Sequence, residues 1–89
     1  MLSMYVIAYD TPCSRRRRRL VSLLSRRGRR VQRSVFELLA DPASLARCLK
    51  ALEKVIAPED SVLVYSASGA RFQLGLAPEA LARPVVSLI

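Results

Sequence analysis

The sequence contains no histidine, and this absence limits the chemistry that the protein can perform. A metal-free nuclease that uses paired imidazoles as general acid and general base is excluded. Acidic residues are also scarce, with 7 Asp and Glu in 89 residues. Any cleavage of a phosphodiester bond would therefore rest on a metal ion held by very few carboxylates.

The two cysteines, Cys13 and Cys48, have neither the spacing of a metal site nor a secretory context. Both are expected to be reduced thiols in a cytoplasmic protein. No apolar run approaches the roughly 20 residues that span a bilayer, and no signal peptide is expected. Together these absences predict a cytoplasmic protein with no membrane partner.

Positive charge is abundant instead: 15 Lys and Arg give a net charge of +8, and 13 of the 15 are arginine. Guanidinium binds phosphate in a planar fork, whereas ammonium acts as a point charge, so this bias favours a nucleic-acid partner. The apolar fraction of 52% argues against disorder. A chain this short buries only a modest share of its own surface, so oligomerisation would be an economical way to add core.

The run Met4–Asp10 alternates large apolar and smaller side chains and is rich in β-forming residues, which predicts a buried central strand. It ends in a carboxylate, Asp10, directly before a dense cationic segment. A lone acid in this position is typical of a site for a metal ion and a polyphosphate. Tyr9 beside it has two open interpretations, a core aromatic with a satisfied hydroxyl or a functional residue.

Five consecutive arginines open the first predicted helix, which is expected over about residues 14–27 with Thr11 or Ser14 as N-cap and Gly28 as its stop. These are Arg15, Arg16, Arg17, Arg18 and Arg19. Cations at a helix N-terminus oppose the macrodipole by roughly 0.3–1 kcal/mol each, and five together repel one another. A bound polyanion would relieve this conflict, which is why we interpret the run as a nucleic-acid site.

The alternative is a solvated helix face next to an aspartate that only helps to form the turn. The helical period places Arg16 and Arg17 nearer the apolar stripe of Leu20, Leu23 and Leu24, so these two are expected over the end of the sheet near Asp10. A second basic cluster follows at the helix exit. Its members are Arg26, Arg27, Arg29, Arg30 and Arg33.

Residues 28–39 alternate as a second strand, whose face with Gln32 and Ser34 is too polar for a core and is expected to meet a subunit or a ligand. Asp41-Pro42 opens a second helix that Pro58 ends. Its buried stripe is expected to contain Leu45, Cys48, Leu49, Leu52 and Ile56. Further strands are predicted at residues 61–65 and 71–74, with a turn at Gly69.

We interpret these two helices and four strands as an α+β fold, a ferredoxin-like β-α-β-β-α-β sandwich with an extra C-terminal strand. Residues 1–75 would form the domain, and residues 76–89 a connector and a tail strand. Helices on one face leave the other face of the sheet open, which favours a homodimer. The apolar tail strand, Val85–Leu88, is expected to pair with a sheet edge of the partner subunit.

Four segments in this order resemble the CRISPR-associated protein 2 family. They are YVIAYD (5–10), RVQRSVFE (30–37), DSVLVY (60–65) and PVVSLI (84–89). The resemblance implies a homodimer in which two copies of Asp10 face each other and hold Mg²⁺, with Tyr9 beside them. It also implies a complex with the CRISPR-associated integrase on duplex DNA, and for some members a metal-dependent endonuclease activity on RNA or DNA. The family's basic and aromatic positions fall on Arg17, Arg19, Arg30 and Phe36.

Three functions remain open. The first is a dimer that binds duplex DNA within an integration complex, and the second is a Mg²⁺-dependent phosphodiesterase built on Asp10. The third is an RNA-binding module that stacks bases on sheet aromatics, but three Tyr and two Phe offer no aromatic-rich strand for it. One carboxylate per subunit favours binding over catalysis, because a two-metal clamp needs more acids.

Overall fold

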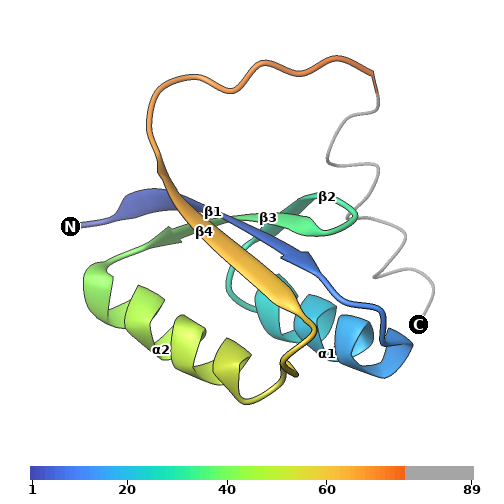
Figure 1. Cartoon of the computed structure of the whole chain (residues 1–89). Coiled ribbons are helices and arrows are strands. Elements are labelled where there is room, and N and C mark those ends of the chain that lie inside the picture. The colour runs from blue at the N-terminus through green and yellow to red at the C-terminus, as the bar shows by residue number, and fades with distance from the viewer. Residues whose placement is uncertain (76–89) are drawn as a thin grey trace.

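The computed structural model describes residues 1–75, and residues 76–89 lie outside the described part. The elements in chain order are β1 (Ser3–Asp10), α1 (Ser14–Ser25), β2 (Arg29–Gln32), β3 (Val35–Ala40), α2 (Pro42–Glu53) and β4 (Ser61–Ala67). The strands form one antiparallel sheet in the order β2-β3-β1-β4, and both helices lie against the same face (Figure 1). The predicted α+β, ferredoxin-like architecture is confirmed. The boundary at residue 75, the tail strand and the dimer remain predictions.

β1 is the centre of the sheet because it pairs with β3 on one side and β4 on the other. Its side chains alternate as predicted: Ile7 and Tyr9 are buried against the helices, whereas Asp10 is exposed. The open face of the sheet therefore receives Met4, Val6 and Ala8 from this strand.

α1 packs on the sheet through Leu20 and Leu24, which are fully buried, as its apolar stripe predicts. The N-cap residue is Cys13, not Thr11 or Ser14, and its side chain makes no capping hydrogen bond. The helix ends at Ser25, where the backbone N–H of Gly28 still donates to the Leu24 carbonyl at 2.8 Å.

α2 begins as predicted, with the Asp41 side chain accepting a hydrogen bond from the Ser44 N–H at 2.7 Å and Pro42 in the first turn. The stripe is confirmed, since Cys48 and Leu52 are buried and the other three residues pack against them. The helix ends at Glu53, five positions before Pro58. The N–H groups of Val55 and Ile56 both donate to the Leu52 carbonyl, and this last turn ends the helix before Pro58 is reached.

Residues 28–39 are not one strand but the hairpin of β2 and β3, with a turn at Arg33 and Ser34. The register between these strands shifts between Arg30 and Gln32, so the alternation does not continue through the turn. The predicted ligand or subunit face is therefore wrong for β3, because Phe36 and Leu38 belong to the core.

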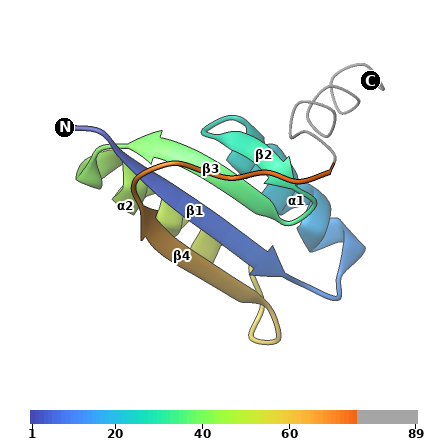
Figure 2. The same ribbon diagram turned by 90° about the horizontal axis from the view of Figure 1, so that it is seen from above.

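The predicted strand at residues 71–74 is also absent. The sheet still has four strands, because residues 28–39 contribute two of them, β2 and β3. The segment after β4 instead crosses the open face above β1 and β3 (Figure 2). Arg71 on this segment pairs with Glu37 of β3 at 2.9 Å. Gly69 has a φ of 83°, which confirms the predicted turn.

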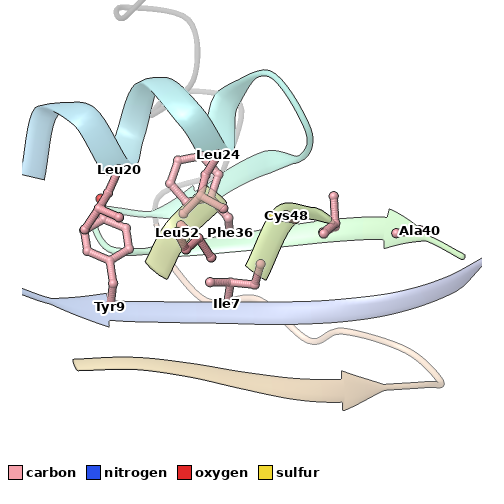
Figure 3. Close-up of a cluster of buried hydrophobic side chains, with 9 residues drawn as sticks. Ile7, Tyr9, Leu20, Leu24, Phe36, Ala40, Cys48 and Leu52 are labelled. Atoms are coloured by element: carbon pink, nitrogen blue, oxygen red, sulfur yellow. The ribbon is translucent and has the colours of Figure 1, made fainter. Parts of the chain in front are cut away.

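The core lies between the helices and the sheet (Figure 3). Its buried members are Ile7, Tyr9, Leu20, Leu24, Phe36, Leu38, Ala40, Cys48 and Leu52. On the open face, Leu39, Leu63 and Tyr65 are 55%, 51% and 56% exposed. A small domain with exposed apolar side chains on one sheet face has surface for a partner. Among residues 1–75, no helix is long and apolar enough to cross a bilayer.

Candidate nucleic-acid and metal site

Asp10 is the last residue of β1, where it pairs with Ser61 of β4. Strand alternation directs its exposed side chain to the open face, away from the helices. Its carboxylate makes no hydrogen bond or ion pair with any residue of the described range 1–75. Within that range, no three His, Cys, Asp or Glu side chains gather as a metal site. One chain thus offers a single free carboxylate here.

The turn after Asp10 is held by Thr11, which is only 4% exposed. Its hydroxyl oxygen accepts a hydrogen bond from the Cys13 N–H at 3.2 Å, and its carbonyl accepts one from Arg17 Nη2 at 2.9 Å. This arrangement brings the start of α1 close to the end of β1. It places Arg17 at the sheet end near Asp10, as the helical period predicts.

Arg16 is tied into an ion-pair network that the sequence did not predict. Its Nε donates to Asp60 Oδ2 at 2.6 Å, and its Nη2 contacts Asp60 Oδ1 at 3.1 Å and Glu59 Oε2 at 3.0 Å. The Asp60 side chain is completely buried and also accepts from the Ala57 N–H at 2.9 Å. This network fastens the first turn of α1 to the start of β4.

The charges in the network stabilise one another. The hydrogen bond from Arg16 holds the pKa of Asp60 well below its usual range, with further help from the Thr11 hydroxyl and the Ala57 N–H. The same bond raises the pKa of Arg16. Because its charge is already matched by two acids, Arg16 contributes little to the attraction of a polyanion. Its role is to hold the first turn of α1 against the start of β4.

The remaining arginines of the run are the cationic surface. Arg15, Arg18 and Arg19 are exposed, and their side chains form no hydrogen bond or ion pair with any residue between 1 and 75. The first turn of α1 contains no acidic residue, so the macrodipole conflict expected from the sequence is present.

Cys13 lies at the same helix end, and a hydrogen bond from the Arg16 backbone N–H lowers the pKa of its thiol.

Arg30 and Arg33 reach the same end of the sheet through the hairpin turn. The Arg33 carbonyl accepts from the Tyr9 hydroxyl at 3.1 Å and from Arg30 Nε and Nη2 at 3.1 and 2.7 Å. The Tyr9 N–H also donates to the Ser34 carbonyl at 3.0 Å. The turn of the second basic cluster is therefore bound to the last residues of β1, beside Asp10.

Tyr9 and Phe36 serve the core. Tyr9 is 6% exposed, and its ring packs against that of Phe36 at a centroid distance of 6.4 Å. Burial raises the pKa of Tyr9, an effect that the nearby charges of Arg30 and Arg17 partly offset. The structure thus matches the interpretation of Tyr9 as a core aromatic with a satisfied hydroxyl, so we do not retain it as a catalytic residue. Phe36 is fully buried and has no surface for a base, so we remove it from the nucleic-acid-binding set.

Sequence reasoning missed Asp60 and gave Thr11 only as an N-cap candidate, although both residues organise this end of the fold. Asp60 directly precedes β4, whose first residue pairs with Asp10, but nothing in the local pattern distinguishes it from the exposed Glu59. Only the pairing of β1 with β4 brings Asp60 against a helix that begins 46 residues earlier in the chain, at Ser14.

Residues 1–73 match the CRISPR associated protein Cas2 family. The chain belongs to this family. The resemblance noted in the sequence is thereby confirmed for the part of the chain that matches.

Similar proteins carry nuclease names. The chain is 43% identical over 67 residues to CRISPR-associated endoribonuclease Cas2 3 of Synechocystis sp., covering 74% of this chain and 73% of that protein. It is 34% identical over 76 residues to CRISPR-associated endonuclease Cas2 2 of Thermus thermophilus, with 84% of each chain covered.

Solved structures share the fold. The crystal structure of a hypothetical protein from Thermus thermophilus superposes with a TM-score of 0.84 at 33% identity, covering 88% of this chain and 96% of that one. Streptococcus pyogenes Cas2 at pH 6.5 gives a TM-score of 0.67 at 34% identity, with 73% and 86% covered.

Proposed function

We propose that this Cas2-family protein is a homodimeric CRISPR adaptation protein that binds duplex DNA in a spacer-integration complex with the CRISPR-associated integrase. The observation that carries the binding proposal is the set of unpaired guanidinium groups at the start of α1. Arg15, Arg18 and Arg19 have no acidic partner in residues 1–75, although five adjacent cations raise the energy of the free helix. Duplex phosphates would supply the missing anions without any sequence preference.

The second basic cluster supports the same ligand. Arg33 is exposed and Arg30 partly exposed, and the bonds from Tyr9 and Arg30 to the Arg33 carbonyl fix their turn beside the end of β1. Together with Arg17 they extend the cationic surface from the helix onto the sheet end. A surface that spans two elements suits a duplex backbone better than a small anion.

The dimer proposal rests on two surfaces. The open sheet face exposes Leu63 and Tyr65, and β4 has a neighbouring strand on only one side within residues 1–75. Beside that free edge lies an apolar groove of about 400 Å³. Its lining includes Leu49, Leu52, Ile56, Val62 and Val64. A strand such as 85–88 of a partner subunit would find both backbone groups and apolar contacts there.

Salt dependence of duplex affinity tests the binding proposal. If six or so phosphates are neutralised, log K should fall against log salt with a slope of about −5. Replacing Arg15, Arg18 and Arg19 together by Gln should make the slope shallower by about one for each phosphate that is no longer neutralised. The matched control replaces Arg47 and Lys50 of α2 and Lys54 at its C-cap by Gln, which removes the same charge elsewhere. Equal weakening in both triple variants, or a strong preference for one DNA sequence, would reject the proposed surface.

The second candidate is a Mg²⁺-dependent endonuclease on RNA or duplex DNA, favoured by the names of the relatives and by the exposed carboxylate of Asp10. Carboxylate oxygen is a ligand that Mg²⁺ accepts, and this ion commonly keeps several waters beside one or two carboxylates. One chain supplies only Asp10, so the residues fit Mg²⁺ only when a second subunit adds its own copy. The ion would then polarise a phosphate oxygen or a water, while the arginines hold the backbone.

Asp10→Asn separates the two candidates. If the Asp10 pair holds the ion, this variant should lose divalent-ion binding in calorimetry and all metal-dependent cleavage. Its duplex affinity should persist, because that rests on the arginines. Cleavage without metal, or full cleavage by the variant, would remove Asp10 from the mechanism. Loss of DNA binding would show that metal and duplex share one site.

A further inference from the structure

The open face of the sheet has little charge, although the chain as a whole is strongly cationic. The charged side chains that β1, β3 and β4 direct to this face are Asp10 at one end and Glu37 in the middle of β3. Two chains with a net charge of +8 each repel one another, so a second copy can approach most easily where cations are scarce. The apolar side chains on this face are Met4, Val6, Ala8, Val35, Leu39, Leu63, Tyr65 and Ala67.

Glu37 is the charge that such a contact would have to bury. It pairs with Val6 of β1 in the register, and Val35 and Leu39 are its neighbours on the same side of β3. Its side chain is already covered to a large extent, with 17% exposed. A carboxylate that loses its remaining water without a counter-charge strongly destabilises an interface. The open face can therefore be buried only if the charge of Glu37 is matched.

The segment after β4 supplies the counter-charge. Arg71 Nε lies 2.9 Å from Glu37 Oε2, and Arg71 Nη2 donates to Glu37 Oε1 at 3.3 Å, so the two side chains meet at two points. The chain reaches this position after the turn at Gly69 and then crosses above β1 and β3 (Figure 2). Arg29 of β2 pairs with Glu37 in the register and is the second cation at this margin of the sheet.

The same segment adds apolar surface that a partner could cover. Phe72 and Leu74, which alternate with Arg71 along the chain, are 93% and 99% exposed. A cavity of about 450 Å³ lies between the segment and the sheet, and Met4 and Val6 of β1 belong to its lining. Side chains of a partner thus have both an exposed surface to contact and a space to enter.

We propose that Arg71 neutralises Glu37 so that the open face of the sheet can be buried against a second copy of this chain. The inference rests on the proposed homodimer and names the residue on which burial of this face depends. Duplex DNA suits the face less well, because its phosphates bind cationic surface and would here meet Asp10 and Glu37. The free edge of β4, where the partner's tail is proposed to pair, adjoins the same face.

The dissociation constant of the full-length dimer tests the proposal, measured by fluorescence-detected sedimentation over a dilution series. Arg71→Gln should raise this constant by about tenfold or more, because each subunit then buries the Glu37 carboxylate without its partner. Glu37→Gln removes the negative charge itself and should raise the constant by less than about threefold. Adding Glu37→Gln to Arg71→Gln should therefore restore the constant to within about threefold of the wild type, since replacing both partners leaves no unpaired charge.

Arg47→Gln is the matched control for the loss of one arginine. Arg47 is an exposed residue of α2, and both helices lie against the opposite face of the sheet (Figure 1). This variant should change the dissociation constant less than about twofold. Melts followed by circular dichroism show whether each variant is folded at the temperature of the measurement.

The possible failures are distinguishable. If the wild type is a monomer at every concentration, the proposed homodimer fails and this inference fails with it. If the wild type dimerises and Arg71→Gln has the same constant, the homodimer stands and Arg71 has no role in it. A double variant as weak as Arg71→Gln would show that the ion pair only holds the segment in place, which rejects neutralisation. If Arg71→Gln keeps the dimer but weakens duplex binding, Arg71 belongs to the nucleic-acid surface instead.

Discussion

Asp10 and Asp60 lie at the same end of the sheet, because Asp10 pairs with Ser61, the residue that follows Asp60. Their side chains nevertheless differ in exposure and in hydrogen bonding. Asp10 is exposed and without a partner among the described residues. Asp60 is fully buried and accepts hydrogen bonds from Arg16 and from the Ala57 N–H. A buried carboxylate persists only when its charge is paired, so Asp60 stabilises the fold and Asp10 is available for a ligand.

Acid stability should report the buried pair. The pKa of Asp60 is lowered in the folded state, so its contribution is present above the ordinary aspartate pKa of about 3.9 and is lost as pH falls below that value. Asp60→Asn should lower the unfolding temperature by several degrees at pH 7 and flatten its decline below pH 4. Thermal melts between pH 7 and pH 2.5 measure both effects.

The control for this experiment is Arg18→Gln, which removes an exposed arginine from the same helix turn without disturbing a hydrogen bond or ion pair in residues 1–75. It should keep or slightly raise the wild-type melting temperature, because it removes one of five adjacent cations near the helix N-terminus, and it should keep the wild-type decline in acid. Arg16→Gln should behave like Asp60→Asn, because it leaves the buried carboxylate without its cation. An Asp60→Asn protein that still loses stability in acid as steeply as the wild type would contradict this account.

At the scale of elements, the passage from α1 into the hairpin depends on close backbone contact. Gly28 does not need a left-handed backbone, since positive φ occurs only at Gly69 and Gly75 among the described residues. A Cβ at Gly28 would lie 2.4 Å from the backbone oxygen of Glu37, closer than any real contact. Glycine at position 28 thus allows β2 to begin directly beside β3. The sequence had instead suggested that Gly28 is needed to stop the helix.

Gly28→Ala should therefore destabilise the protein by overpacking, by about 1–3 kcal/mol, because a backbone carbonyl cannot rotate away as a side chain could. Urea unfolding followed by circular dichroism measures the change. Ser25→Ala, an exposed position at the end of the same helix, is the control and should be neutral or slightly stabilising. If Gly28→Ala unfolds at the wild-type urea concentration, the close contact is not a constraint.

The helices were more predictable than the hairpin for a physical reason. Asp41-Pro42 and the apolar period of α2 are local signals, and they were sufficient to predict where the helix begins and which of its residues are buried. The turn at Arg33 and Ser34 contains no Gly, Pro, Asn or Asp to mark it, so residues 28–39 have the pattern of one strand. The docking of this turn depends on bonds from Tyr9, which lies 24 residues away from Arg33.

For the whole molecule, assembly can be tested through the tail. We predict an obligate dimer in which residues 85–88 of each chain pair with the β4 edge of the other, because β4 lacks an outer neighbour in residues 1–75. Deleting residues 84–89 should give monomer or aggregate in light scattering. As a control, Pro84→Ala keeps the strand residues and should keep the dimer. A truncated chain that stays a soluble dimer would reject the exchange of tail strands.

By itself the sequence determined the broad character of this protein. Arginine excess, the alternation of Met4–Asp10 and the cap and stripe of α2 are short-range signals, and they sufficed for the fold class, while four short segments carried the resemblance to the family. The tertiary structure decided which arginines are free. The helical period separates Arg16 and Arg17 from the rest of the run, but it does not show that Arg16 has an acidic partner. β1–β4 pairing places Asp60 against Arg16, 44 residues away. Local periodicity carries no information about partners at such separations, so only the folded chain divides the run into a structural residue and a binding surface.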